Sequence, residues 1–319
     1  MARRQSGRDI NGILLLDKPA GISSNRALQI VKRLFQANKA GHTGSLDPFA
    51  TGLLPICFGE ATKISAFLLD ADKSYLANAC LGTATTTADT EGEVSQQNPV
   101  PVLSETDIQA VLSTFLGSQS QIPPMYSALK QDGKKLYELA RKGIEVERTP
   151  RKITIHQLEL NSWKTPELSF SVSCSKGSYI RVLAEDIAKK LGSCAHLMQL
   201  RRTRAGCFEL DQAVTIDELE ALLERSVEND LSALDELLLP LDSALAKAPI
   251  IKLSAKQGLA IQQGRKIDLN ELQEMPVETN EEIFRLYSVG VDMNSYLLGV
   301  GRLEKGFVRS VRLFPGLYS

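Results

Sequence analysis

The sequence predicts an α+β protein with a mixed, largely antiparallel sheet, flanking helices and a small, β-barrel-like C-terminal domain. Neighbouring strand candidates at residues 153–160 and 168–175 have no crossover helix between them, which favours antiparallel pairing over a doubly wound sheet. Between other strand candidates, apolar residues recur at helical spacing. Beyond residue 249, glycines interrupt short β-type runs. A length of 319 residues allows two domains, and we expect them at residues 1–248 and 249–319.

Helix and strand signals alternate along the first hundred residues. Residues 23–39 begin at a serine cap and carry apolar side chains on one helical face. Residues 83–93 have turn composition and no apolar period, so we expect an exposed loop there. The other expected elements of this part are strands at residues 12–16 and 75–82 and a helix at residues 59–73.

The rest of the larger domain contains an insertion and further helices. Residues 124–152 begin at the second of two prolines, Pro123 and Pro124, and interrupt the pattern of strands. Thr215 and Glu218 form a capping box at the start of an acidic helix. We also expect helices at residues 104–117 and 179–192 and a linker at residues 246–249.

Composition excludes several classes of protein. Apolar residues make up 43% of the chain and charged residues 24%, which is typical of globular proteins and not of disordered or fibrous ones. No apolar run approaches the roughly 20 residues that span a bilayer, and the run at residues 13–16 is too short for a signal peptide. We therefore expect a cytoplasmic protein. The five cysteines and three histidines show no CxxC motif and no metal-ligand spacing, so we expect reduced thiols and no metal site.

The net charge of −1 is distributed unevenly along the chain. Residues 1–208 carry 26 Lys and Arg against 19 Asp and Glu, a net charge of +7. Residues 209–248 carry 2 against 11, a net charge of −9. A basic body joined to an acidic segment indicates a polyanionic partner at one face, although a merely solvated basic surface would give the same composition.

One short segment, GHTGSLDPFATG at residues 41–52, surrounds a single acid with glycines and a proline. Glycine permits backbone conformations that other residues resist, and Pro48 restricts the chain directly after Asp47. Such a loop fixes the position of a carboxylate, as a nucleophile or an electrostatic catalyst requires. Two other interpretations stay open. The carboxylate can cap nearby N–H groups in an Asx-turn, or the loop can hold a phosphate, although no GKS or GKT sequence follows.

Longer motifs point to a family. The segment GHTGSLDPFATGLLPICFGEATK is followed in order by KSY, KGSYIR and LRRTRAG. Together with GRDINGILLLDKPAGISS near the N-terminus, these motifs resemble the bacterial tRNA pseudouridine synthase B family over residues 8 to about 245. The resemblance implies the pseudouridine synthase fold and an isomerase that converts the T-loop uridine of tRNA, position 55, to pseudouridine.

The resemblance implies that Asp47 is the catalytic aspartate. The reaction breaks the N1 glycosidic bond of uridine, turns the base, joins C5 to the ribose and removes the C5 proton. Asp47 can attack the sugar or the ring, or abstract a sugar proton, and the sequence does not choose among these roles. No cofactor or metal is implied. Because the target base lies inside a folded loop, the reaction also implies base flipping.

The resemblance assigns roles to further residues of the pocket. Tyr75 corresponds to the tyrosine that stacks on the target base, although alone it would read as a half-buried strand residue. Arg181 corresponds to the arginine paired with the catalytic acid, where a guanidinium favours the ionised carboxylate. The other implied substrate-binding residues are Tyr179, which contacts uracil, His42, which supports flipped-out nucleotides, and Lys63 and Leu200, which have supporting roles in the pocket.

The insertion at residues 124–152 closes over the T-arm of tRNA in the family, so the resemblance implies a mobile thumb. Residues 130–152 contain eight basic and four acidic residues. We expect contacts with RNA phosphates, which weaken as salt rises, from Lys130, Lys134, Lys135, Arg141, Lys142, Arg201 and Arg202.

The tail segments GLAIQQGRKI and GVGRLEKG are similar to the small RNA-binding domain, the PUA domain, of pseudouridine synthases and archaeosine transglycosylases. The resemblance implies a monomer that binds tRNA and requires no protein partner. The long basic insertion favours this over a relative that depends on a guide RNA. The other alternative is an RNA-binding chaperone that helps tRNA to fold without required catalysis.

Overall fold

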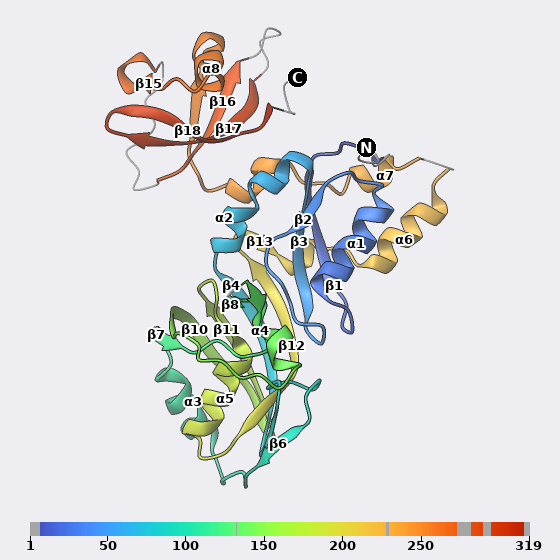
Figure 1. Cartoon of the computed structure of the whole chain (residues 1–319), viewed down its shortest axis with the longest axis vertical. Coiled ribbons are helices and arrows are strands. Elements are labelled where there is room, and N and C mark those ends of the chain that lie inside the picture. Colours follow the sequence, from blue (N-terminus) through green and yellow to red (C-terminus); the bar gives the residue numbers. More distant parts are fainter. Residues whose placement is uncertain (1–6, 132, 228–229, 273–281, 290–294, 316–319) are drawn as a thin grey trace.

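The computed structural model of the chain is elongated, with a five-stranded C-terminal sheet at one end and a nine-stranded sheet along the rest (Figure 1). The residues that it describes are 7–131, 133–227, 230–272, 282–289 and 295–315. Residues 290–294, which belong to the predicted β-rich tail, lie outside this part of the chain. None of the helices described is long and apolar enough to cross a membrane.

The larger sheet has the strand order β1-β3-β12-β4-β11-β10-β7, with β2 and β13 paired at its side. Every pairing is antiparallel except that of β12 with β3. The expected mixed, largely antiparallel sheet is confirmed. Its strands are β1 (Gly12–Lys18), β2 (Ala40–His42), β3 (Thr51–Phe58), β4 (Lys73–Leu81), β7 (Gly117–Gln121), β10 (Arg151–Lys164), β11 (Glu167–Cys174), β12 (Ala195–Ala205) and β13 (Phe208–Glu209).

Helices cover the sheet through three apolar clusters. The helices α3 (Glu105–Ser113) and α5 (Ile180–Lys190) pack on β4, β10, β11 and β12. The helices α1 (Ser24–Leu34) and α6 (Ile216–Arg225) pack on β1 and β3. A third cluster joins β1 and β3 to Leu297, Val300 and Phe314 of the C-terminal part, so the two sheets share buried surface.

The C-terminal sheet has the order β14-β16-β17-β18-β15 and carries α8 against a core of its own. It is curled, as the sequence pattern predicted, and stands above the larger sheet in Figure 1. Its elements are β14 (Ile250–Leu253), α8 (Ala255–Gln262), β15 (Ile267–Asp268), β16 (Phe284–Val289), β17 (Ser295–Glu304) and β18 (Phe307–Leu313).

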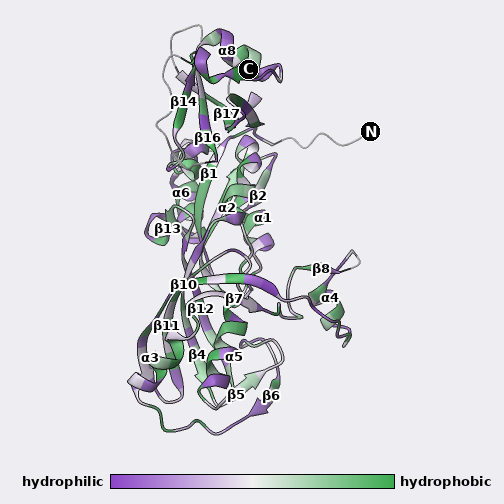
Figure 2. Cartoon of the chain, turned by 90° about the vertical axis from the view of Figure 1, so that its left-hand side faces the viewer, coloured by the Kyte–Doolittle hydropathy of each residue, from purple (hydrophilic) through white to green (hydrophobic). Residues whose placement is uncertain are grey.

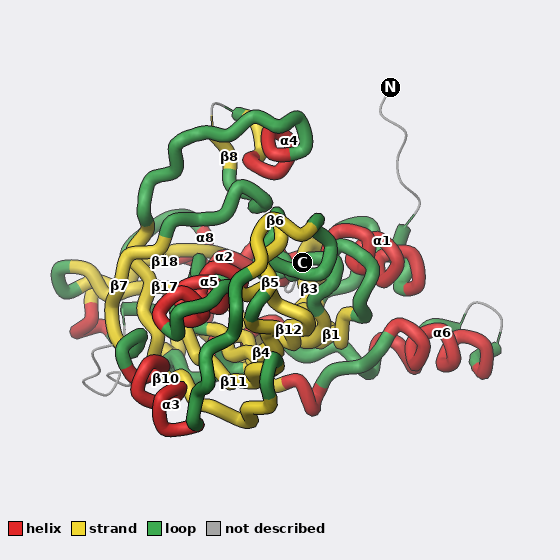
Figure 3. Tube along the Cα trace, turned by 90° about the horizontal axis from the view of Figure 1, so that it is seen from below, coloured by secondary structure: helices red, strands yellow, loops and turns green. Residues whose placement is uncertain are grey.

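The insertion leaves the sheet after β7 and returns at β10. It contains β8 (Lys130–Gln131), β9 (Lys134–Lys135) and α4 (Leu136–Ala140), and it projects from the body in two views (Figures 2 and 3). The acidic segment contains α6, α7 (Ser232–Asp235) and the short turns η2 (Leu210–Gln212) and η3 (Leu241–Leu245).

Two local predictions were wrong. Instead of one helix at residues 59–73, the chain forms a 3₁₀ turn η1 (Gly59–Lys63), then α2 (Ser65–Asp70), and Lys73 already begins β4. The Lys73 ammonium donates to the carbonyls of Leu68 and Leu69 at 3.0 and 2.7 Å, which stops the helix there. The expected exposed loop at residues 83–93 starts with β5 (Thr83–Thr85), which pairs with β6 (Val94–Gln97), and it buries Asp89.

Candidate active site

The loop between β2 and β3 is fastened at both sides of Asp47. Ser24 at the start of α1 bonds the backbone of Leu46 twice, with Ser24 Oγ donating to the carbonyl at 3.0 Å and accepting from the N–H at 2.7 Å. The carbonyl of Pro48 accepts from Gly21 N–H at 2.9 Å. Because the residues before and after Asp47 are both held, the carboxylate has a fixed position.

Gly52, the second residue of β3 and close to the end of this loop, allows β3 to lie close to β12. Its φ is +100°, and a Cβ at this position would lie 2.3 Å from the carbonyl oxygen of Arg202. No side chain fits at that distance. The start of β3, directly after the loop that carries Asp47, can therefore lie this close to β12 because residue 52 is glycine.

The Arg181 guanidinium is buried, with 3% of its side chain exposed, and binds in several directions. Its Nε pairs with Asp47 Oδ2 at 2.9 Å. Its Nη1 donates to the carbonyl of Thr87 at 2.6 Å, and its Nη2 donates to the carbonyl of Tyr126 at 2.7 Å. The buried carboxylate of Asp89 lies 3.7 Å from Nη1. The planar fork of an arginine can make this set of contacts, whereas a lysine ammonium cannot.

Burial raises the pKa of the Asp47 carboxyl, and the nearby charge of Arg181 opposes that rise. The Asp89 carboxylate pushes the pKa upward as well. The Asp47 side chain is still 38% exposed, so one side of the carboxylate is open to a substrate. Arg181 therefore favours the ionised form of Asp47, as expected from the sequence. It does so against the loss of hydration that burial of Asp47 causes, which the sequence did not reveal.

Lys18 lies under the same loop and was missed in the sequence. It is fully buried, and its ammonium donates to the carbonyls of Pro19 and Ile22 at 2.8 Å each and of Pro48 at 3.3 Å. Burial lowers the pKa of Lys18 to about 8, although the negative charge of Asp47 opposes that change. In the sequence, Lys18 stands between the expected strand at residues 12–16 and Pro19, and this position indicated only a turn of the chain.

Tyr75 and Leu200 lie on neighbouring strands and belong to one apolar cluster with Leu46 of the loop. Tyr75, on β4, is partly buried, and burial raises its pKa. Leu200, on β12, is buried. The charge of Asp47 also acts on Tyr75, so the aromatic ring and the carboxylate occupy the same region.

Tyr179 is the residue before the first turn of α5, two positions ahead of Arg181. Its backbone N–H and carbonyl both bond the side chain of Gln121, at 2.8 and 3.0 Å. Burial raises the pKa of its phenol, and the charge of Asp47 adds to this. Tyr179 thus lies with Arg181 and Asp47, as the predicted pocket requires.

His42 lies on β2 and is half-buried. Burial lowers its pKa, with a further contribution from the charge of Arg202. Its Nδ1 atom is buried and has no hydrogen-bond partner among the described residues.

Two of the predicted site residues do not lie where the sequence placed them. Arg202 is 1% exposed, so the expected phosphate contact is wrong. Its Nε donates to the carbonyl of Leu53 at 2.6 Å, and its Nη2 donates to that of Gly44 at 3.1 Å. The physical reason is the alternation of side chains along β12, which sends successive residues to opposite faces.

Lys63 is not in the pocket either. It follows the end of β3 that is remote from Asp47, and an eight-residue strand spans about 23 Å. Its ammonium pairs with Glu60 at 2.6 Å and donates to the carbonyl of Leu313 at 3.3 Å, which places it at the junction with the C-terminal sheet.

Of the other predicted backbone-binding residues, those in the insertion are at its surface. Lys130, Lys134, Arg141 and Lys142 are exposed, and Lys135 is partly exposed. Lys135 and Arg141 lie 5.4 and 5.5 Å from the ring of Tyr137, within the range of cation–π contacts. Arg201 is partly exposed and pairs with both carboxylate oxygens of Asp17, at 3.1 and 2.6 Å.

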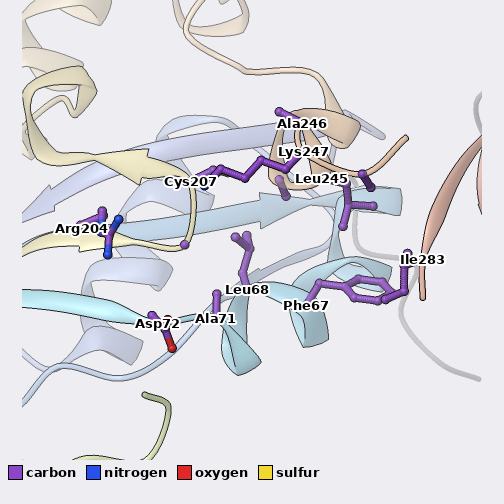
Figure 4. Close-up of a pocket in the computed structure, with 13 residues that line it drawn as sticks. Phe67, Leu68, Ala71, Asp72, Arg204, Cys207, Leu245, Ala246, Lys247 and Ile283 are labelled. Atoms are coloured by element: carbon purple, nitrogen blue, oxygen red, sulfur yellow. The ribbon is translucent and has the colours of Figure 1, made fainter. Parts of the chain in front are cut away.

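A separate pocket of about 330 Å³ lies between α2, the turn after β12 and η3 (Figure 4). Its lining includes Phe67, Leu245 and Cys207 but not Asp47 or any other predicted site residue. In the described part of the chain, no group of three or more His, Cys, Asp and Glu side chains could hold a metal ion.

Comparison with known proteins defines the class. Residues 32–180 match the family "TruB family pseudouridylate synthase (N terminal domain)", and residues 181–246 match "tRNA pseudouridylate synthase B C-terminal domain". The chain is therefore similar to pseudouridylate synthases over most of the larger sheet.

Two solved structures have the same fold. A "Cbf5-Nop10-Gar1 Complex" has a TM-score of 0.70 at 24% identity, covering 95% of this chain and 84% of that one. An "H/ACA RNP bound to a substrate RNA containing 2'-deoxyuridine" has a TM-score of 0.69 at 22% identity, covering 95% and 84%.

Curated relatives are more specific. A tRNA pseudouridine synthase B from Nitrosococcus oceani is 50% identical over 98% of this chain and 97% of its own length. One from Pseudomonas fluorescens is 56% identical over 77% of this chain and 80% of its own. The chain belongs to the tRNA pseudouridine synthase B family.

Proposed function

We propose that this chain isomerises the uridine at position 55, in the T-loop of tRNA, to pseudouridine. The observation that carries the proposal is the Asp47–Arg181 pair, with a donor–acceptor distance of 2.9 Å, in a loop fastened on both sides. Family membership supplies tRNA as the substrate and uridine isomerisation as the reaction.

The reaction is an internal rearrangement. The N1–C1′ bond breaks, a C5–C1′ bond forms, and the proton lost from C5 is balanced by a proton gained at N1. Asp47 is the group that acts on the nucleotide, by attack on the sugar or the ring or by removal of a sugar proton. Arg181 keeps the carboxylate available as its ionised form, because its positive charge opposes the rise in pKa caused by burial.

The surrounding residues hold the flipped base. We assign the Tyr75 ring, which packs against the cluster that contains Leu46 and Leu200, to stacking on uracil, an interaction worth about 1–3 kcal/mol per base. Tyr179 contacts the base from the start of α5, and Leu200 forms the apolar floor. We assign His42, which is half-buried on β2 directly before the Asp47 loop, to the nucleotides displaced from the T-loop.

The thumb at residues 124–152 binds the backbone of the T-arm. Most of its basic side chains are exposed to solvent, as a phosphate-binding surface requires. We propose a division of the chain at residues 248 and 249, with the C-terminal sheet as an RNA-binding domain. We also propose a cytoplasmic monomer that needs no protein partner or cofactor.

Release of tritium from a transcribed tRNA labelled at uridine C5 tests the function. We expect release from the wild-type chain, none from Asp47→Asn, and none from a tRNA without the T-loop uridine. Tight binding of tRNA by the wild-type chain without release would contradict the proposal and favour an RNA chaperone.

A further inference from the structure

Gln121 lies where the thumb leaves the larger sheet. It is the last residue of β7, and its strand partner Arg151 is the first residue of β10. Its side chain is buried, with 5% of the residue exposed. A buried amide at this position needs hydrogen-bond partners, because an unpaired buried polar group is costly.

Those partners are the backbone groups of Tyr179. The N–H of Tyr179 donates to Gln121 Oε1 at 2.8 Å, and Gln121 Nε2 donates to the carbonyl of Tyr179 at 3.0 Å. Tyr179 precedes the first turn of α5, and its own side chain makes no capping bond in the described structure. Gln121 therefore holds the start of α5 from the neighbouring strand β7. In most helices this task falls to a side chain at the end of the helix itself.

The start of α5 carries Arg181, and a second bond ties it to the thumb. Arg181 Nη2 donates to the carbonyl of Tyr126, which is five residues beyond Gln121. The bonds of Arg181 to Asp47 and Thr87 are 2.9 and 2.6 Å long, so a shift of α5 by about 1 Å would lengthen them beyond hydrogen-bonding range. The position of the guanidinium thus depends on the contact between Gln121 and Tyr179.

We infer that Gln121 is a positioning residue for catalysis: its amide holds the first turn of α5 so that Arg181 stays paired with Asp47 at the root of the thumb. The inference rests on the proposed function. It predicts that Gln121 affects turnover through the charge state of Asp47 and leaves the binding of tRNA unchanged.

The pH dependence has a definite sign. The charged groups that act on Asp47 are Arg181 from α5, Lys18 from β1, and Asp89 and Glu91 from the turn after β5. The two cations favour the ionised carboxylate and the two acids oppose it. If Arg181 moves away, the pKa of Asp47 rises further, so the loss of turnover grows as the pH falls.

The test compares Gln121→Met with Gln119→Met over a range of pH. Gln119 is two residues earlier on the same strand and is partly buried. Its Nε2 donates to the carbonyl of Phe115 at 2.7 Å, so its side-chain amide is bonded to the chain after α3 and not to Tyr179. We expect Gln121→Met to lower kcat by roughly 10²-fold, most at acid pH, with KM for tRNA unchanged. We expect Gln119→Met to keep the wild-type kcat and pH profile.

Gln121→Glu is a second variant that keeps the side-chain volume and the acceptor for Tyr179 N–H, but cannot donate while ionised. We expect its kcat to fall below that of the wild type, because a carboxylate oxygen would then face the carbonyl of Tyr179. This variant carries the test if thermal unfolding shows that Gln121→Met does not fold. A kcat in both Gln121 variants equal to that of Gln119→Met overturns the inference, as does a loss that is the same at every pH. An inactive wild-type chain overturns the proposed function as well.

Discussion

Replacement of Gly52 by alanine is the sharpest test of how the Asp47 loop is built. A Cβ at this position would lie 2.3 Å from the carbonyl oxygen and 2.7 Å from the nitrogen of Arg202. Carbon–oxygen contacts shorter than about 3.3 Å are not tolerated. The strands β3 and β12 must therefore move apart by about 1 Å, directly beside the loop that carries the carboxylate.

The expected cost has two parts. Alanine at a φ of +100° adds backbone strain of about 1–2 kcal/mol. Separation of two packed strands adds about 1–3 kcal/mol, as overpacking does in a core. A displacement of about 1 Å between Asp47 and its partners lowers kcat by roughly 10²-fold.

Gly117→Ala is the matched control. Gly117 has a φ of +89° but no atom within 4 Å of its Cβ position, so the same substitution adds strain without a clash. Urea unfolding measures the free energy of unfolding, and tritium release measures kcat. If Gly52→Ala and Gly117→Ala lose equal stability and both keep the wild-type kcat, the close approach of the loop to β12 does not position the catalytic acid.

Three further substitutions test the site and the thumb. Asp47→Asn should reduce tritium release to background while the Kd for tRNA stays at the wild-type value; measurable turnover would remove Asp47 from the nucleotide chemistry. Arg181→Met should raise the pKa of Asp47, because the effects of burial and of Asp89 are then opposed only by the charge of Lys18, so its kcat should fall most at acid pH. A loss independent of pH would contradict that cause. Reversal of charge at Lys134 and Lys135 should raise KM for tRNA and reduce the salt dependence of binding, by about 0.9 in logarithmic slope for each phosphate that the protein no longer neutralises; an unchanged slope would show that these lysines do not contact phosphate.

The sequence was sufficient where a local pattern determines the structure. The serine cap and apolar face of α1 and the capping box of α6 lie within a dozen residues, and both helices form as expected. The glycine and proline pattern around Asp47 also indicated a fixed carboxylate, because backbone freedom at residues 44, 48 and 52 is a local property.

The sequence was insufficient where contacts between residues far apart in the chain determine the structure. Asp89 lies in a segment of turn composition, where its carboxylate accepts from Thr87 Oγ1 and from the N–H of Glu91. Its approach to Arg181, at 3.7 Å, comes from across the fold and is not visible in the sequence. Lys18 is buried because three carbonyls from two loops surround its ammonium. The burial of Arg202 was within reach of the sequence, since the alternation along a strand does not allow Arg201 and Arg202 to face the same surface.

The strand order explains why these residues meet. β12 lies between β3 and β4, parallel to the first and antiparallel to the second. Arg202 is level with Gly52 on one side and with Tyr75 on the other. Its guanidinium bonds the carbonyl of Gly44 in the Asp47 loop. The Asp47 loop and Tyr75 belong to segments separated by one strand. The buried arginine on that strand bonds the loop and lies level with Tyr75, so its burial is itself part of the construction of the site.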